Sequence, residues 1–404
     1  MKKTISYLTL LMFAVLMYGP ILPAQEVDQT EQREAELAMA ESFRAGFQEI
    51  VDDLNSGSFE RFTNAIDQPA MLERIFALRL INQRIKKQFR ENFEFAIEPM
   101  VKALLTNGDD GAKATLLNID SRGDFGRATV RYELPNFQYN YHEYDLRLNR
   151  HGGVVIVDWT DFLQGEKFSD GLGETLIMAA PSDPAVRKLL DFKNARPRHI
   201  FQMAQLLKAA RDHDVDRYFE ILESLDEQMQ SQRIAVVTTV HLTKQVRKRR
   251  KLRTALIAVA KYFPEEPLYS LMLLDYYFPA RRYEDALQAL LRLEKRLGVE
   301  DGAMKARLSA AALVADKPED AASFAERAVT LEPGLELGWW STLQASTAQS
   351  RFDTAIKALV VLEKQFGRTL DSEALQKDKR FTALLESPEY EAWLASRKQA
   401  AATP

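Results

Sequence analysis

Histidine, tyrosine, tryptophan and aspartate side chains lie close together along two neighbouring segments, and these are the residue types in this chain that can do chemistry. His142 and Tyr144 lie on one segment, and Asp158, Trp159 and Asp161 end the apolar run that follows it. An imidazole beside a carboxylate can transfer protons as a general acid–base pair. We therefore expect these five residues at the mouth of a pocket.

Three roles are open to this group: proton transfer, binding of an apolar small ligand, and a structural or docking role. The sequence has no serine-nucleophile elbow, phosphate-binding loop or dinucleotide fingerprint. Its five histidines are scattered, and none stands at metal-site spacing from another ligand on a predicted helix. We expect a protein that is not an enzyme and that carries no metal and no cofactor.

The composition describes a folded protein of two or three domains. The 404 residues exceed what one hydrophobic core usually serves. Of these residues, 46% are apolar and 28% are charged, as in ordinary folded proteins. The net charge of −4 provides no general attraction to nucleic acid. Because there is no cysteine, disulfides and thiol chemistry are excluded.

The first 24 residues have the layout of a secretory signal peptide. Lys2 and Lys3 precede an apolar run over residues 5–18, and Pro23 and Ala24 stand just before polar sequence. A secreted chain without cysteine fits a bacterial periplasm. We place the protein there, with an uncleaved inner-membrane anchor as the alternative, and interpret residues 25–35 as a linker.

The segment that follows, residues 36–180, predicts an α+β domain. Apolar residues first recur at helical spacing and then alternate as in strands. We expect helices followed by a four-stranded, curved antiparallel sheet. Tyr139 and Tyr141 have one parity and Tyr144 has the other, which predicts a β-bulge near His142.

This order of elements resembles the nuclear transport factor 2-like cone, in which a curved sheet wraps a long helix and encloses a pocket. The segment Val157-Asp158-Trp159, with Gly165 downstream, is similar to periplasmic phospholipid-carrier domains of that fold. The resemblance implies a conical domain whose interior binds an apolar molecule. Enzymes of the fold place aspartate and histidine in the same interior.

Three apolar ladders recur every 34 or 35 residues in the C-terminal half of the chain. They begin at Ala286, Ala321 and Ala355, and a helix breaker follows each of them. A period near 34 with two helices per unit indicates a helical solenoid. We expect it over residues 184–369, with units beginning near residues 199, 233, 267, 302 and 336 and with capping helices and a tail over residues 370–404.

These units resemble tetratricopeptide repeats over about residues 199–369. Small residues at the three ladder starts fall where helices of that family cross most closely, although the upstream units carry Tyr218 and Leu252 there. In the family, the first helices of the units hold a ligand on a concave face. The resemblance therefore implies a protein partner and a groove of His241, Lys244, Leu271, Asp275, Phe278, Trp340 and Gln344.

Two further alternatives concern this helical region. The apolar groove residues could instead pack against neighbouring helices. From Lys244 to Arg253, seven of ten residues are basic, which indicates either a solvated turn or contact with an anionic partner or membrane surface. We expect no nucleic acid as partner. The favoured function is a periplasmic adaptor or scaffold, and the alternative is a carrier that holds a lipid or other apolar molecule in the N-terminal domain.

Overall fold

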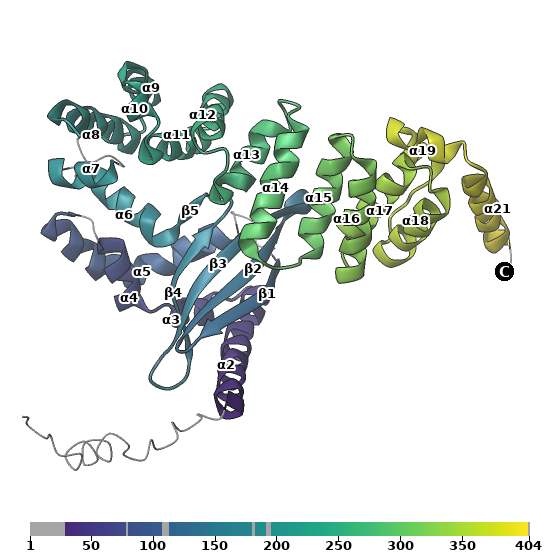
Figure 1. The fold of residues 1–404 in the computed structure, drawn as a ribbon, viewed down its shortest axis with the longest axis horizontal. Helices are drawn as coiled ribbons and strands as arrows, with labels where there is room; N and C mark the ends of the chain where they lie inside the picture. The colour runs from purple at the N-terminus through teal and green to yellow at the C-terminus, as the bar shows by residue number, and fades with distance from the viewer. Residues whose placement is uncertain (1–28, 78–79, 107–112, 180–181, 191–194, 403–404) are drawn as a thin grey trace, which may run out of the picture.

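The computed structural model describes residues 29–77, 80–106, 113–179, 182–190 and 195–402. An antiparallel sheet with flanking helices comes first, and a long all-helical region follows it (Figure 1). This confirms the expected change from an α+β segment to helices. The predicted signal peptide lies outside the described residues, and the later part of the expected linker is helical, since the first described helix begins at Gln29.

In the described part of the chain, four helices precede the sheet: α2 (Gln29–Asn55), α3 (Glu60–Ala65), α4 (Gln68–Phe76) and α5 (Gln83–Thr106). Asp67 caps α4, because its side chain accepts a hydrogen bond from the backbone N–H of Ala70. At the end of α2, the Asn55 side-chain amide exchanges two hydrogen bonds with the backbone of Ala114 on the first strand. These bonds set where α4 begins and how α2 lies against the sheet.

The sheet has five antiparallel strands in sequence order: β1 (Lys113–Arg122), β2 (Phe125–Leu134), β3 (Gln138–Leu148), β4 (Val154–Asp161) and β5 (Glu166–Lys167). A 3-10 turn, η1 (Pro135–Phe137), joins β2 to β3. The prediction of four strands was wrong by one, because β5 was missed. With two residues, β5 is too short to show an alternating pattern, and only its pairing with Thr160 and Asp161 defines it.

Both faces of β3 are buried, which explains the change of parity in the sequence. Tyr144 packs in the core between the sheet and α2, on what we call the inner face. Tyr139 and Tyr141 pack in the core of the helical region, on the outer face. Since β2 and β3 pair without a register shift, the predicted bulge near His142 was wrong. The shift occurs in the pairing of β3 with β4, just after Asp145.

Two helices lead away from the sheet, α6 (Phe168–Ala179) and α7 (Asp183–Leu189). The helices that follow form successive pairs, and each pair contacts the next. We call them the helical array: α8 (Pro197–Arg211) with α9 (Val215–Ser224), α11 (Arg233–Gln245) with α12 (Arg249–Tyr262), α13 (Ser270–Tyr277) with α14 (Tyr283–Leu297), α15 (Gly302–Val314) with α16 (Pro318–Leu331), and α17 (Glu336–Ala348) with α18 (Phe352–Phe366). Two short elements lie between pairs, α10 (Glu227–Gln230) and η2 (Pro267–Tyr269).

The turn inside each pair contains one non-glycine residue with a left-handed backbone, with φ from 53° to 58°. A Cβ makes this conformation unfavourable, so its recurrence marks a shared turn geometry. The residues follow one another at intervals of 34 or 35 positions: His213, Arg247, Arg281, Asp316 and Ser350. This spacing of the turns therefore also covers the two upstream pairs.

The chain ends in α19 (Ser372–Gln376), η3 (Lys379–Phe381), α20 (Thr382–Leu385) and α21 (Pro388–Ala402). Phe381, Tyr390 and Trp393 from this segment pack in one apolar cluster with Leu359 and Leu362 of α18. The segment therefore covers the last pair of the array. Figure 1 shows the array as an arch that passes over one end of the sheet, with α21 at its far end.

Candidate functional site

Buried polar side chains form a continuous network on the inner face of the sheet. His142 Nε2 lies 3.3 Å from the Asp161 carboxylate, and Asn140 donates a hydrogen bond to the same carboxylate at 2.9 Å. On the other side of the ring, His142 Nδ1 lies 3.0 Å from the Tyr144 hydroxyl. That hydroxyl lies 2.6 Å from the hydroxyl of Tyr132. The network thus crosses β2, β3 and β4 at positions that share one face.

This network is closed to solvent. His142 and Tyr144 are 0% exposed, and Asp161 is 4% exposed. Burial alone would raise the pKa of Asp161, but the charge and hydrogen bond of His142 lower it below its ordinary value. Burial raises the pKa of Tyr144 well above its ordinary value. A fully buried imidazole has no surface for a substrate, so this arrangement supports a structural role for the His142–Asp161 pair.

The five residues expected at a pocket mouth separate between the two faces of the sheet. Asp158 lies on the outer face, opposite Asp145 of β3. Because side chains alternate along β4, the residues on either side of Thr160 lie on the other face. Four of the five are therefore on the inner face: His142, Tyr144, Trp159 and Asp161. The sequence indicated neighbouring strands but not which face each side chain would take.

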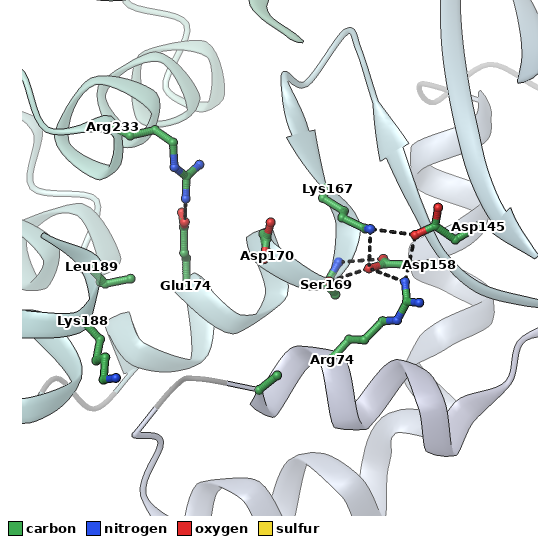
Figure 2. A pocket seen from close by; sticks show the side chains of 11 residues that line it. Arg74, Asp145, Asp158, Lys167, Ser169, Asp170, Glu174, Lys188, Leu189 and Arg233 are labelled. Atoms are coloured by element: carbon green, nitrogen blue, oxygen red, sulfur yellow. Dashed lines mark hydrogen bonds and ion pairs between the residues drawn. The ribbon is translucent and has the colours of Figure 1, made fainter. Parts of the chain in front are cut away.

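Asp158 belongs instead to a charged pocket of about 470 Å³ beside α4 and α6 (Figure 2). Lys167 Nζ lies 2.7 Å from Asp145 and 3.6 Å from Asp158. Arg74 Nη1 lies 2.8 Å and 3.6 Å from the same two carboxylates. The Ser169 hydroxyl donates to Asp158 at 2.6 Å. In Figure 2 the two cations approach the carboxylates from opposite sides.

Charges of opposite sign balance one another in this pocket. Burial would raise the pKa of Asp145, but the two neighbouring cations lower it, whereas burial leaves the pKa of Asp158 raised. Two carboxylates whose pKa values are shifted in opposite directions can serve as the acid and the base of a proton transfer. However, both cations beside them are already neutralised, and a further ion pair, Glu174 with Arg233, joins α6 to α11. The contacts hold α4, α6 and α11 around the sheet.

A buried cluster that the sequence analysis missed joins the outer face to the helical array. Arg131, 3% exposed, donates to Asp301 and to both carboxylate oxygens of Glu332, at 2.8 and 3.0 Å. The Tyr141 hydroxyl donates to Asp301 at 2.6 Å. Asp301 also caps α15, because it accepts from the N–H of Met304 at 2.8 Å. The only signal in the sequence was an arginine in the middle of a strand.

Three further contacts extend this junction along the array. Arg307 of α15 donates to the backbone carbonyl of Tyr139 at 3.3 Å. Arg296 at the end of α14 pairs with Glu143, which is 5% exposed. On α11, His241 Nε2 lies 3.0 Å from the carbonyl oxygen of Gln164, in the loop after β4. The sheet domain therefore contacts the array from α11 to the end of α16.

The predicted groove residues on α11 and α13 lie along this junction. His241 bonds to the sheet domain, and Leu271 is buried in the core cluster that contains Tyr139 and Tyr141. Phe278 is half-buried against the same cluster. Lys244 is half-buried and Asp275 is exposed. Burial lowers the pKa of Lys244 and raises the pKa of Asp275. The charge of each residue acts against the pKa shift of the other.

The predicted groove residues on α17 lie beyond the contacts with the sheet. Trp340 is half-buried, and its Nε1 donates to Glu336 at 2.9 Å. Gln344 is half-buried and accepts a hydrogen bond from Arg380 at 3.3 Å. The structure thus divides the predicted groove into a part beside the sheet, near α11 to α15, and a part on α17 next to the C-terminal helices.

The basic run from Lys244 to Arg253 covers the end of α11, the turn and the start of α12. Lys251 lies over the ring of Phe219, with Nζ 3.9 Å from the ring centroid. Among the described residues, no carboxylate forms an ion pair with the exposed members of the run: Arg247, Lys248, Arg249, Arg250 and Arg253.

Comparison with known proteins adds no relative: no family model matches the sequence, and no curated protein matches it. In the part of the chain that the structure describes, no helix has both the length and the apolar character needed to cross a membrane. The same residues contain no group of three or more histidine, aspartate or glutamate side chains placed to hold a metal ion.

Proposed function

We propose that this chain is an adaptor of the bacterial cell envelope, in which the helical array binds a protein partner and the sheet domain braces the array. One observation carries the proposal: the array already holds a polypeptide segment, the β2–β3 hairpin of its own chain, through Asp301 and Glu332. Paired helices that bind one segment in this way present a grooved surface, and a second polypeptide segment can bind to it.

The repeated turn supports the tetratricopeptide-type interpretation of the array, because stacked units of this kind form extended binding surfaces. The first helices of four pairs begin at Pro197, Arg233, Gly302 and Glu336. These starts lie close to the unit starts expected from the period. The cone-like interpretation of the N-terminal domain is supported by α2, which packs along the inner face of the sheet.

The proposed binding surface is the part of the groove on α17. Trp340 and Gln344 are half-exposed there, and Leu337 adds an apolar side chain one turn earlier. An aromatic anchor with a polar neighbour suits a helix or an extended peptide that presents apolar side chains. The proposed location is the periplasm, which follows from the predicted signal peptide.

Site-specific photo-crosslinking in intact cells tests this function. A photo-reactive amino acid at Gln344 is expected to trap one envelope protein, and Trp340→Ala is expected to abolish the adduct. Loss of such an anchor typically costs about 2 kcal/mol or more of binding free energy. The matched control is the same photo-reactive amino acid at Glu326, an exposed position on α16, which is expected to trap nothing specific.

Two results would count against the adaptor. One is equal trapping from Gln344 and Glu326, because the contact would then be unspecific. The other is loss of the adduct together with a lower melting temperature in Trp340→Ala, which would mean that Trp340 is part of the core. The double variant with Phe278→Ala extends the test to the groove beside the sheet.

The alternative function, a carrier for an apolar molecule, requires space between α2 and the sheet. Aromatic side chains fill this region, each 1% exposed or less: Phe43, Phe47, Phe62, Phe93 and Trp159. A carrier would have to displace them. Extraction of gently purified protein followed by mass spectrometry separates the two functions, because lipid recovered at about one molecule per chain would favour the carrier.

A further inference from the structure

A second pocket, of about 430 Å³, lies between β5, α6 and α11. Its wall is mainly apolar and includes Met178, Val237 and Leu242. Its polar lining includes Glu166 and His241, which come from different elements, together with Glu174, Arg211, His213, Thr238 and Gln245. This volume falls within the range of small-molecule sites, which combine an apolar wall with a few placed polar groups.

Glu166 and His241 each present an acceptor atom to which no described residue donates a hydrogen bond. No described residue forms a hydrogen bond or an ion pair with the Glu166 carboxylate. His241 Nε2 lies 3.0 Å from the Gln164 carbonyl, which can only accept, so Nε2 carries the proton. Nδ1 then bears a lone pair. Burial lowers the pKa of His241, which favours this neutral form.

Glu166 contrasts with Asp161, its partner across the β4–β5 pairing. Asp161 accepts hydrogen bonds from Asn140 and from the backbone N–H groups of Leu163 and Gln164. Glu166 has no such donors, and burial, followed by the charge of Asp161, raises its pKa to about 7. The fold thus half-buries a carboxylate and leaves its oxygens without a counter-charge at bonding distance.

The first turn of α6 makes room for this carboxylate. A Cβ at Gly171 would lie 2.6 Å from Glu166 Oε1, so a larger residue there would displace the carboxylate. The neighbouring acid on α6, Glu174, is already paired with Arg233. Glu166 is therefore the acidic group of this pocket that is free to meet a ligand.

We propose that this pocket binds an alkylammonium group, that is, a primary amine carried on an apolar chain. An ammonium group has three N–H donors and no acceptor, which complements the Glu166 carboxylate and His241 Nδ1. The hydrocarbon chain would lie against Met178, Val237 and Leu242. This inference does not depend on the adaptor proposal, because the binding surface proposed there is on α17, whereas this pocket lies between β5, α6 and α11.

Titration calorimetry on the full chain at pH 8 tests the site with hexylamine, hexan-1-ol and hexanoate as probes. Hexylamine is expected to bind at least tenfold more tightly than the alcohol, and hexanoate is expected not to bind. Glu166→Gln is expected to weaken hexylamine at least tenfold and to leave the alcohol unchanged. Glu326→Gln, a change at an exposed position on α16, is the matched control and should have no effect.

Lowering the pH from 8 to 6 is expected to weaken hexylamine binding, because protonation of Glu166 removes the negative charge. Other charged or titratable groups surround Glu166 or line the pocket, and Glu166→Gln retains all of them: Asp161, Asp170, Glu174, Arg211, His213, Arg233, His241 and Lys244. The contribution of Glu166 is therefore the difference in pH effect between the unaltered chain and Glu166→Gln, and this difference should account for most of the loss of affinity.

Equal affinity for hexylamine and hexan-1-ol would overturn the proposal, as would unchanged hexylamine binding in Glu166→Gln. Thr175→Trp offers a second variant, because Thr175 is an exposed residue on the rim and its replacement would block the pocket without changing the core. It is expected to abolish hexylamine binding, and undiminished binding would contradict the location. Nα-acetyl-lysine amide distinguishes two sources of the ammonium group. If it binds as tightly as hexylamine, the ligand is a lysine side chain. If it binds tenfold more weakly than hexylamine, the ligand is a free amine.

Discussion

On the inner face of the sheet, buried polar groups bond to side chains 2 to 21 positions away in the sequence. On the outer face, Arg131, Tyr141 and Glu143 bond to residues 153 to 201 positions away. The inner face thus completes its hydrogen bonds within one domain. The buried Arg131, Tyr141 and Glu143 of the outer face cannot do so until the helical array is folded against them, so the two halves of the molecule share one set of buried charges.

Removing Arg131 is the largest expected disturbance of this arrangement. Arg131→Met leaves the buried Asp301 carboxylate without its cation, and loss of one partner from a buried pair typically costs about 3–5 kcal/mol of unfolding free energy. Urea denaturation measures this cost. Arg127→Met, on the same face of β2 but with a side chain 54% exposed, is the matched control and should cost about 1 kcal/mol or less. Similar losses in both variants would show that the outer face does not join the halves.

Glu166 and Asp161, which pair across β5 and β4, are expected to make the unfolding free energy depend on pH in opposite directions. The folded-state pKa of Glu166 is raised from 4.5 to about 7, so its favourable contribution is present below pH 4.5 and is lost as the pH rises through 7. At about 1.4 kcal/mol per pKa unit, Glu166→Gln should stabilise the protein by roughly 3 kcal/mol at pH 8 and change little at pH 4. Denaturation at the two pH values measures this.

Asp161 provides the contrast. Its folded-state pKa is lowered, so its contribution is present above the ordinary aspartate value of 3.8 and is lost as the pH falls through the lowered value. Asp161→Asn should therefore destabilise the protein at neutral pH, where Glu166→Gln does not. Destabilisation by both variants at pH 8 would contradict the assignment of Glu166 as the unpartnered carboxylate.

Two tyrosine substitutions compare the faces directly. Tyr141→Phe removes a hydrogen bond to Asp301 and Tyr144→Phe removes bonds to Tyr132 and His142, and each should cost about 1–3 kcal/mol. Hydrogen exchange locates the effect. Tyr141→Phe should increase exchange at the start of α15, whereas Tyr144→Phe should increase it only in the N-terminal domain. The same exchange pattern in both variants would mean that the two faces are not energetically separate.

The basic turn is expected to give the smallest effect, because its exposed side chains have no acidic partners among the described residues. The combined change Arg249→Gln and Arg250→Gln should alter the unfolding free energy by less than about 0.5 kcal/mol. The variants also decide between the two roles left open for this run. Sedimentation with anionic vesicles that is lost on substitution and in high salt would indicate membrane contact, and its absence would indicate a solvated turn.

Patterns among neighbouring residues predicted the helices and strands of this fold better than they predicted the contacts between them. The helical period beginning at Ala286 is a property of neighbouring residues, so it predicted paired helices and their approximate starts. β5 escaped because two residues, Glu166 and Lys167, cannot display a period. The left-handed turns at His213 and Arg247 were also not predicted, because the residue types at these positions do not identify such a turn.

The candidate site could be predicted only in part, for a different reason. His142 and Asp161 were correctly placed on neighbouring strands, but their face depends on the register of β4. The buried parity of Tyr139 and Tyr141 was attributed to a bulge, although it results from a second core that covers the outer face. Nothing local to Arg131 indicates that its partner stands at position 301, since the pairing depends on the folded shape of the whole array.

The shared buried charges also set a constraint on biosynthesis. Arg131 leaves the ribosome 170 residues before Asp301, and at about 5–20 residues per second this interval is on the order of ten seconds or more. During that time the outer face of a folded sheet would present Arg131, Tyr139 and Tyr141 to the surroundings, open to wrong partners. Delivery of the whole chain in an unfolded state before it folds, as in export across a membrane, would supply both halves of the junction together.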